Sequence, residues 1–267
     1  MKPTALLWMS EPKTRIMRVL STDHMGEKKM RKVLKAVSVL LPGIIILAAV
    51  FLIYAGVYYH ADGDAVAALE TDGTVKVEQT DYGWYFDGPG RDTLIFYPGA
   101  KVEETAYAPL MKELAEAGMD ACLVRMPLRL AFFGISAADQ IIPRYDCDSW
   151  YLGGHSLGGV MASSYASRHE DSLAGLILLA AYPADVLEDP LPVLSIYGSD
   201  DRVLDIESYN EAHDNMPGRF TEYVIEGGNH AGFGNYGEQK GDGKALLSPA
   251  EQQEVTVQVI METAAGW

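Results

Sequence analysis

The pentapeptide Gly-His-Ser-Leu-Gly at positions 154–158 constrains the fold more than any other feature of this chain. The apolar run 150–152 precedes it and a stretch with helical spacing follows it, so the pentapeptide lies where a strand turns into a helix. A turn this tight strains the backbone of its central residue, and small neighbours such as Gly154 and Gly158 permit that conformation. Because the turn would expose the hydroxyl above the sheet, we interpret Ser156 as a candidate nucleophile, with a glycine-rich turn capped by a serine as the alternative.

Continuous apolar runs predict the strands of a mostly parallel sheet. They lie at 93–97, 121–124, 150–152, 176–179 and 193–197, and runs of this kind are typical of strands that are covered on both faces. Helical stretches separate them. Two alternating segments, 74–79 and 83–87, predict an antiparallel hairpin at the sheet edge, and the capping box that begins at Ser248 predicts the last helix. The chain therefore has the pattern of an α/β protein with a doubly wound sheet.

Four stretches resemble those of α/β-hydrolases and, within that superfamily, of the bacterial alpha/beta hydrolase fold-five group, a relative of dienelactone hydrolases. These stretches are 97–101, 154–159, 197–201 and 227–234. The resemblance extends from about Gly73 to the C-terminus. It implies an α/β-hydrolase domain at 73–267, and the short connection between 176–180 and 193–197 predicts that this domain has no large cap. Dienelactone hydrolases proper use a cysteine nucleophile, whereas this chain has Ser156, so their lactone substrate is not implied.

A serine nucleophile needs a histidine base, and the base needs a carboxylate that fixes its tautomer. In this fold the order along the chain is serine, acid, histidine. His169 and His213 lie near the ends of expected helices, where they would be solvated. His230 follows the strand 220–225 in a loop of glycines that can bend the ring over the serine. We therefore predict that His230 is the base.

The acid is expected in the turn after the strand that ends at Gly198, because the sites of α/β sheets lie at this carboxyl edge. Asp200 and Asp201 both lie in this turn, and Asp205 is a weaker candidate. The resemblance favours Asp201. Asp200 would then be an ordinary turn or helix-capping residue.

Two backbone amides are predicted to stabilise an oxyanion at this site. The helix after the serine points its first amides at the place where the oxyanion would form, so Leu157 is one expected donor. The resemblance implies that the second donor lies in the loop 98–101, where other members have a His-Gly motif. We expect the amide of Ala100 to be this donor, with Lys101 as the alternative.

The segment from Ala36 to Tyr59 contains no charged residue, and it exceeds the about 20 apolar residues that cross a bilayer. Basic residues crowd its N-terminal side, and tyrosines that would form an interfacial belt lie at its other end, at Tyr54, Tyr58 and Tyr59. We predict a basic cytoplasmic tail at 1–35, a signal anchor at 36–59, a linker at 60–72 and a catalytic domain on the extracytoplasmic side. A cleaved signal peptide is the alternative, because Ala49 or Ala61 could follow an apolar core.

The net charge changes sign at this segment. Up to Lys35 the chain has nine Lys/Arg and three Asp/Glu, whereas the remainder has 12 Lys/Arg and 34 Asp/Glu. An acidic domain repels nucleic acid and anionic headgroups, so neither is expected as a partner.

The stretch Lys240–Gly243 lacks P-loop spacing and is interpreted as a flexible surface loop near His230. No zinc-type His/Cys spacing occurs, and no cofactor is expected; Cys122 and Cys147 could form a disulfide.

These features predict a membrane-anchored serine hydrolase that cleaves an ester, thioester or small amide through an acyl-enzyme. The short connection between 176–180 and 193–197 leaves no room for a lid domain, although the segment 125–144 could fold over the site. We therefore expect short acyl groups, on small molecules or on the cell envelope, in a shallow aromatic cleft lined by Tyr107, Phe132, Phe133, Tyr182 and Phe233. The alternatives are an acyltransferase with the same triad and a non-catalytic binding protein on a hydrolase scaffold.

Overall fold

The computed structural model describes residues 13–267, so the first twelve residues of the predicted basic tail lie outside the described part. Helix α1 spans Lys13–Gly56. Among the described residues it supplies one segment, Lys29–Gly56, that is long and apolar enough to cross a membrane. The chain divides into two compact units at the boundary between Tyr54 and Ala55, and the second unit, Ala55–Trp267, holds the rest of the fold.

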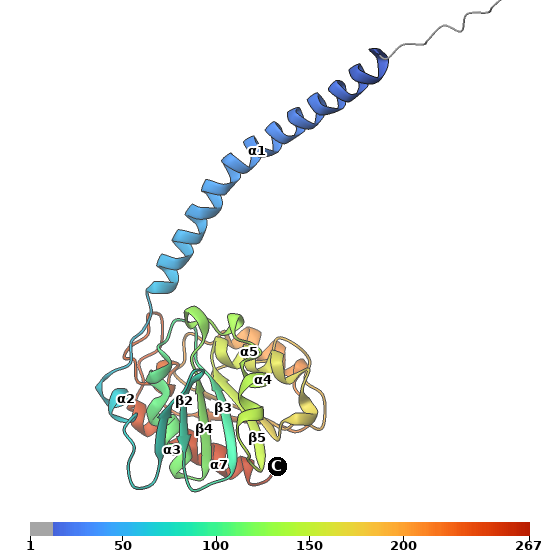
Figure 1. The fold of residues 1–267 in the computed structure, drawn as a ribbon. Coiled ribbons are helices and arrows are strands. Elements are labelled where there is room, and N and C mark those ends of the chain that lie inside the picture. Colours follow the sequence, from blue (N-terminus) through green and yellow to red (C-terminus); the bar gives the residue numbers. More distant parts are fainter. Residues whose placement is uncertain (1–12) are drawn as a thin grey trace, which may run out of the picture. The chain divides into compact units, whose positions relative to one another are not determined.

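The second unit is built on a sheet of eight strands in the order β1-β2-β4-β3-β5-β6-β7-β8, four of which Figure 1 labels in this sequence as β2, β4, β3 and β5. Strands β1 and β2 are antiparallel, and β2 pairs antiparallel with β4; all other pairs are parallel. The predicted edge hairpin and the predicted mostly parallel sheet are therefore confirmed. The strand bounds are β1 Lys76–Gln79, β2 Gly83–Asp87, β3 Asp92–Tyr97, β4 Met119–Val124, β5 Ser149–His155, β6 Gly175–Leu179, β7 Val193–Gly198 and β8 Phe220–Ile225.

Helices cover both faces of the sheet. On one face α3 packs against β4 and α7, and on the other α5 packs against β3, β5 and β6. The capping box predicted at Ser248 is present, because its side chain accepts from the Glu251 amide while the Glu251 carboxylate accepts from the Ser248 amide. The helix bounds are α2 Gly63–Ala67, α3 Ala108–Glu116, α4 Ala137–Ile141, α5 Leu157–Ala166, α6 Ile206–Glu211 and α7 Pro249–Ala264; the 3₁₀ turns are η1 Glu104–Tyr107, η2 Pro127–Arg129, η3 Ala131–Phe133, η4 Ile142–Arg144, η5 Glu170–Ser172, η6 Ala212–Asn215 and η7 Ala231–Phe233.

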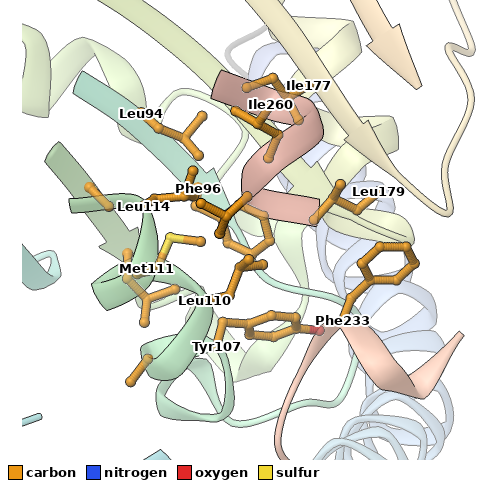
Figure 2. Close-up of a cluster of buried hydrophobic side chains, with 14 of the residues drawn as sticks. Leu94, Phe96, Tyr107, Leu110, Met111, Leu114, Ile177, Leu179, Phe233 and Ile260 are labelled. Atoms are coloured by element: carbon orange, nitrogen blue, oxygen red, sulfur yellow. The ribbon is translucent and has the colours of Figure 1, made fainter. Parts of the chain in front are cut away.

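Alternate residues of each central strand enter two separate apolar clusters. In β3, for example, Leu94 and Phe96 pack toward α3 and α7, whereas Ile95 and Tyr97 pack toward α4 and α5. Figure 2 shows the first cluster, with Tyr107 and Phe233 at one end of it. Burial on both faces explains why these strands are continuous apolar runs in the sequence.

Two further sequence expectations concern connections within this fold. Strand β6 leads to β7 through a segment without a helix, which agrees with the absence of a large cap domain. Cys122 and Cys147 are both free cysteines, so the disulfide that the sequence left open does not form in this structure. Cys122 is fully buried in β4, and burial raises the pKa of its thiol to about 12.

Candidate active site

Ser156 occupies a sharp turn between β5 and α5. Its backbone angles are φ 52° and ψ −125°, outside the regions that a non-glycine residue usually adopts. The Ser156 amide donates to the carbonyl of Leu179 on the neighbouring strand β6 at 2.9 Å, which fixes the turn against the sheet. The flanking glycines are needed for space, since a Cβ on Gly154 would lie 2.7 Å, and one on Gly158 2.0 Å, from the carbonyl oxygen of Tyr97.

The predicted base and the predicted acid lie in contact. Nδ1 of His230 is 2.8 Å from Oδ2 of Asp201, and each side chain is only 2% exposed. The other carboxylate oxygen of Asp201 accepts from the amides of Val203 and Leu204, both at 2.8 Å, so the carboxylate is held from two directions. The His230 ring centroid lies 4.4 Å from that of His155, the residue that precedes Ser156, which brings the base beside the turn.

The remaining candidates lie elsewhere. Among the described residues the Asp200 side chain makes no hydrogen bond, and only its amide is used, as a donor to the carbonyl of Gly228 at 2.8 Å. Asp205 is the N-cap of α6, where its carboxylate accepts from two helix amides. His169 stacks on Tyr165, and His213 lies 3.3 Å from the carboxylate of Glu222. Among the described residues no hydrogen bond, ion pair or ring contact joins any of these four side chains to His230.

Asp242 joins the two loops that carry the acid and the base. One of its oxygens accepts from the amide of Ala231, directly after the base, at 2.8 Å. The other accepts from the amide of Arg202, directly after the acid, at 3.2 Å. The interpretation of Lys240–Gly243 as a flexible surface loop did not include these bonds. Contacts between loops that are separated in sequence leave no local pattern, so no motif pointed to this residue.

The loop after β3 contains one amide without an acceptor. The amide of Gly99 donates to the hydroxyl of Tyr107 at 3.2 Å, and that of Lys101 donates to the carbonyl of Arg129 at 2.8 Å. Within the described residues the amide of Ala100, between them, donates to none. Leu157, at the other expected position, is the first residue of α5, where a helix leaves its amides without an intrahelical partner. The geometry thus leaves Ala100, rather than Lys101, available as the second donor.

His155 links the serine turn to the loop after β3 through the buried hydroxyl of Tyr107. Its Nδ1 lies 2.8 Å from the hydroxyl of Tyr107, the same hydroxyl that accepts from Gly99. Burial, and then the neighbouring His230, hold the pKa of His155 well below its ordinary value, so the ring is neutral. Tyr107, whose hydroxyl links His155 and Gly99, therefore supports the site from the core and does not line a cleft.

The expected aromatic cleft is only partly present. Tyr107 and Phe233 are fully buried in the apolar core, so the expectation that they line the cleft is wrong; helical spacing and glycine-rich flanks could not distinguish core from rim. Phe132 and Phe133, in contrast, are 45% and 49% exposed. Their turn η3 packs on α5, and the preceding turn η2 supplies the Arg129 carbonyl to the Ala100 loop. The segment 125–144 therefore does border the site.

The site has no arrangement of metal ligands. Among the side chains that the structure describes, no group of three or more His, Cys, Asp or Glu residues is placed to hold a metal ion. A pocket of about 440 Å³ opens beside the base loop, between Asn229–Gly232 and the segment 237–249. Asp242 lines this pocket as well, which adds to its contacts with both loops.

Comparison with known proteins identifies the family to which this fold belongs. Residues 93–254 match the model of the alpha/beta hydrolase family. No curated protein matches the chain. Among solved structures, TT1662 from Thermus thermophilus is 15% identical with a TM-score of 0.52, over 71% of this chain and 98% of its own. A serine hydrolase involved in carbazole degradation is 13% identical with a TM-score of 0.53, over 73% and 100%. A membrane phospholipase A described as a bacterial virulence factor is 14% identical with a TM-score of 0.53, over 92% and 98%.

Proposed function

Because this chain belongs to the alpha/beta hydrolase family, we propose that it is a serine hydrolase that cleaves carboxylic esters, thioesters or small amides through an acyl-enzyme. Ser156 is the nucleophile, His230 the general base and Asp201 the residue that orients the base. The amides of Leu157 and Ala100 stabilise the oxyanion. The proposed substrates are small molecules or groups on the cell envelope that carry a short acyl chain.

One observation carries this proposal. A histidine and a carboxylate, each 2% exposed and 2.8 Å apart, lie against His155, which directly precedes a serine held at φ 52° between a strand and a helix. Burying such a pair costs desolvation free energy, and strain at a serine is also unfavourable, so neither feature is explained by stability. Both are what a nucleophile and its base require.

The reaction follows from these positions. The Ser156 oxygen attacks the acyl carbon while its proton moves to Nε2 of His230. Asp201, which accepts from Nδ1–H at the opposite side of the ring, fixes the tautomer and balances the imidazolium charge. The oxyanion receives the two amide hydrogen bonds, the bond to the leaving group breaks, and His230 protonates that group. Water, deprotonated by His230, then releases the acid and restores the serine.

Labelling with a fluorophosphonate probe tests the proposal. The full-length protein in detergent should react with the probe, and peptide mapping should find the phosphonyl group on Ser156. Modification of a different residue, or absence of modification in protein shown to be folded, would contradict the mechanism. The variant Asp205→Asn, altered at the N-cap of α6, which asparagine also caps, serves as a control and should be labelled at the wild-type rate.

We also propose that α1 anchors the enzyme in a membrane with its lysine-rich end in the cytoplasm. Support comes from the span Lys29–Gly56 and from the charge asymmetry on its two sides. Protease added to spheroplasts should degrade the hydrolase unit and spare an epitope at the N-terminus. Protection of the hydrolase unit would reverse the orientation, and a mature protein that begins after Ala49 or Ala61 would favour a cleaved signal.

A further inference from the structure

The residues just after the membrane-length helix form part of the framework around the site. Tyr59, three positions after the end of α1, forms a parallel bridge with Val102. Its amide donates to the carbonyl of Lys101 at 2.8 Å, and its carbonyl accepts from the amide of Glu103 at 2.9 Å. All of these residues belong to the unit Ala55–Trp267.

Tyr59 also contacts the loop on the base side of the site. Its ring centroid lies 5.6 Å from that of Tyr236, and its hydroxyl accepts from the amide of Lys240 at 3.1 Å. Asp62 continues the contact, because its amide donates to the carbonyl of Asn235 at 2.9 Å. Tyr59 therefore connects the segment after Ala100 with the segment after His230.

Tyr58 strengthens the same junction from the other side. The guanidinium of Arg129 lies 3.4 Å from the centroid of the Tyr58 ring, while the Arg129 carbonyl accepts from the Lys101 amide at 2.8 Å. Both backbone groups of Lys101 are thus bonded, one to Arg129 and the other to Tyr59.

Lys101 needs these bonds. Its φ of 58° lies in the left-handed region, which is unfavourable for a non-glycine residue and persists only where neighbours enforce it. The amide proposed as an oxyanion donor belongs to the preceding residue, Ala100. If the Tyr59 bond is lost, Lys101 can relax, and the direction of the Ala100 amide changes with it.

From these contacts we infer that Tyr59 is a positioning residue for the oxyanion loop, so that the segment 58–62 is part of the catalytic framework and not a passive linker. The inference rests on the proposed function. An oxyanion donor acts mainly in the transition state, so loosening it lowers kcat more than it raises KM.

The variant Tyr59→Pro, studied in the full-length protein in detergent, lacks the backbone N–H that donates to the Lys101 carbonyl. We expect kcat for nitrophenyl acetate to fall at least about tenfold, with KM changed by less than about threefold. Binding of a trifluoromethyl ketone, which forms a tetrahedral adduct, should weaken by a factor similar to the loss in kcat/KM. Tyr59→Phe, which keeps the N–H and the ring, should stay within about threefold of wild type.

Gly63→Pro is the matched control. Gly63 is the first residue of α2, where a proline lacks only an amide that the helix leaves unpaired, and a Cβ there meets nothing within 4 Å. It should have wild-type kcat. Where Tyr59→Pro does not fold, Tyr59→Ala replaces it. This variant keeps the N–H but loses the ring contact with Tyr236 and the bond to Lys240 that hold the segment in place, so kcat should fall by about threefold or more.

The outcomes separate the two proposals. If wild-type protein is not labelled at Ser156 by a fluorophosphonate, the proposed function fails and the role of Tyr59 with it. If it is labelled and folded Tyr59→Pro or Tyr59→Ala keeps wild-type kcat and ketone affinity, only the role of Tyr59 is overturned. Equal losses in Tyr59→Pro and Gly63→Pro would also overturn it.

Discussion

The two sides of the site are built differently. On the side of Asp201 and His230, polar groups from three loops are joined by hydrogen bonds of 2.8 to 3.2 Å. The side chains of Asp201 and His230 are buried, and Asp242 bonds to both of their loops. On the oxyanion side, Lys101, Leu128 and Arg129 have positive φ, and the neighbouring Phe132 is 45% exposed. The first side holds the proposed base and the carboxylate that orients it, whereas the second combines positive-φ backbone with an exposed aromatic ring.

Removing the reacting groups on the first side should have the largest effect. Ser156→Ala or His230→Ala should lower kcat by about 10⁴-fold or more, because the triad acts as a unit. The melting temperature should change little for Ser156→Ala, since Ser156 is half-buried and its hydroxyl makes no hydrogen bond among the described residues. Turnover by either purified variant within about tenfold of wild type would contradict the assignment of the triad.

The acid is tested by a matched pair of adjacent residues. Asp201→Asn should lower kcat by about 10³- to 10⁴-fold, because an amide in place of the carboxylate disfavours the required tautomer of His230. Asp200→Asn should be nearly neutral, since the Asp200 side chain makes no hydrogen bond among the described residues. Steady-state kinetics on both variants decides the matter. A loss confined to Asp200→Asn would show the assignment to be wrong.

The positions of Ser156, Asp201 and His230 at one edge of the sheet were predictable from the sequence, whereas the supporting contacts around them were not. Ser156, Asp201 and His230 follow strands whose apolar runs are local patterns, and a parallel sheet gathers the ends of its strands at one edge. The roles of Asp242 and Tyr59 were not predictable. The Asp242 carboxylate accepts from backbone amides of two other loops, and Tyr59 bonds through its own backbone to residues about 40 positions away, so neither contact leaves a local sequence pattern.

Asp242 offers a smaller test on the acid and base side. Asp242→Ala leaves the amides of Ala231 and Arg202 without this acceptor, and the loss costs about 1–3 kcal/mol at the buried Ala231 and less at the exposed Arg202. We expect kcat to fall by about 10- to 100-fold, since the loops that carry acid and base lose their connection. Glu238→Ala, at an exposed position of the same loop, is the control and should resemble wild type. Urea unfolding and kinetics together test this, and an unchanged kcat would remove Asp242 from the framework.

The oxyanion side should respond weakly and through KM. Phe132→Ala removes an exposed ring three residues after Arg129, whose carbonyl accepts from the Lys101 amide, and each methylene that the ring covers contributes about 0.8 kcal/mol. KM for nitrophenyl butyrate should rise by about two- to fivefold, with kcat unchanged and with nitrophenyl acetate less affected, because acetate has too short a chain to reach the ring. Tyr223→Ala, at an exposed position of β8, is the control for loss of a surface aromatic.

The same series of esters tests the preference for short acyl groups. The connection from β6 to β7 contains no helix, so no lid domain is inserted at this position to enclose a long chain. We therefore expect kcat/KM to be greatest for acetate or butyrate and lower for palmitate, measured below the concentration at which palmitate esters form micelles. A maximum at palmitate, reduced by Phe132→Ala, would instead mean that the exposed rings of the oxyanion side bind a long acyl chain. The apolar surface would then determine the substrate to a greater extent than the absence of a lid.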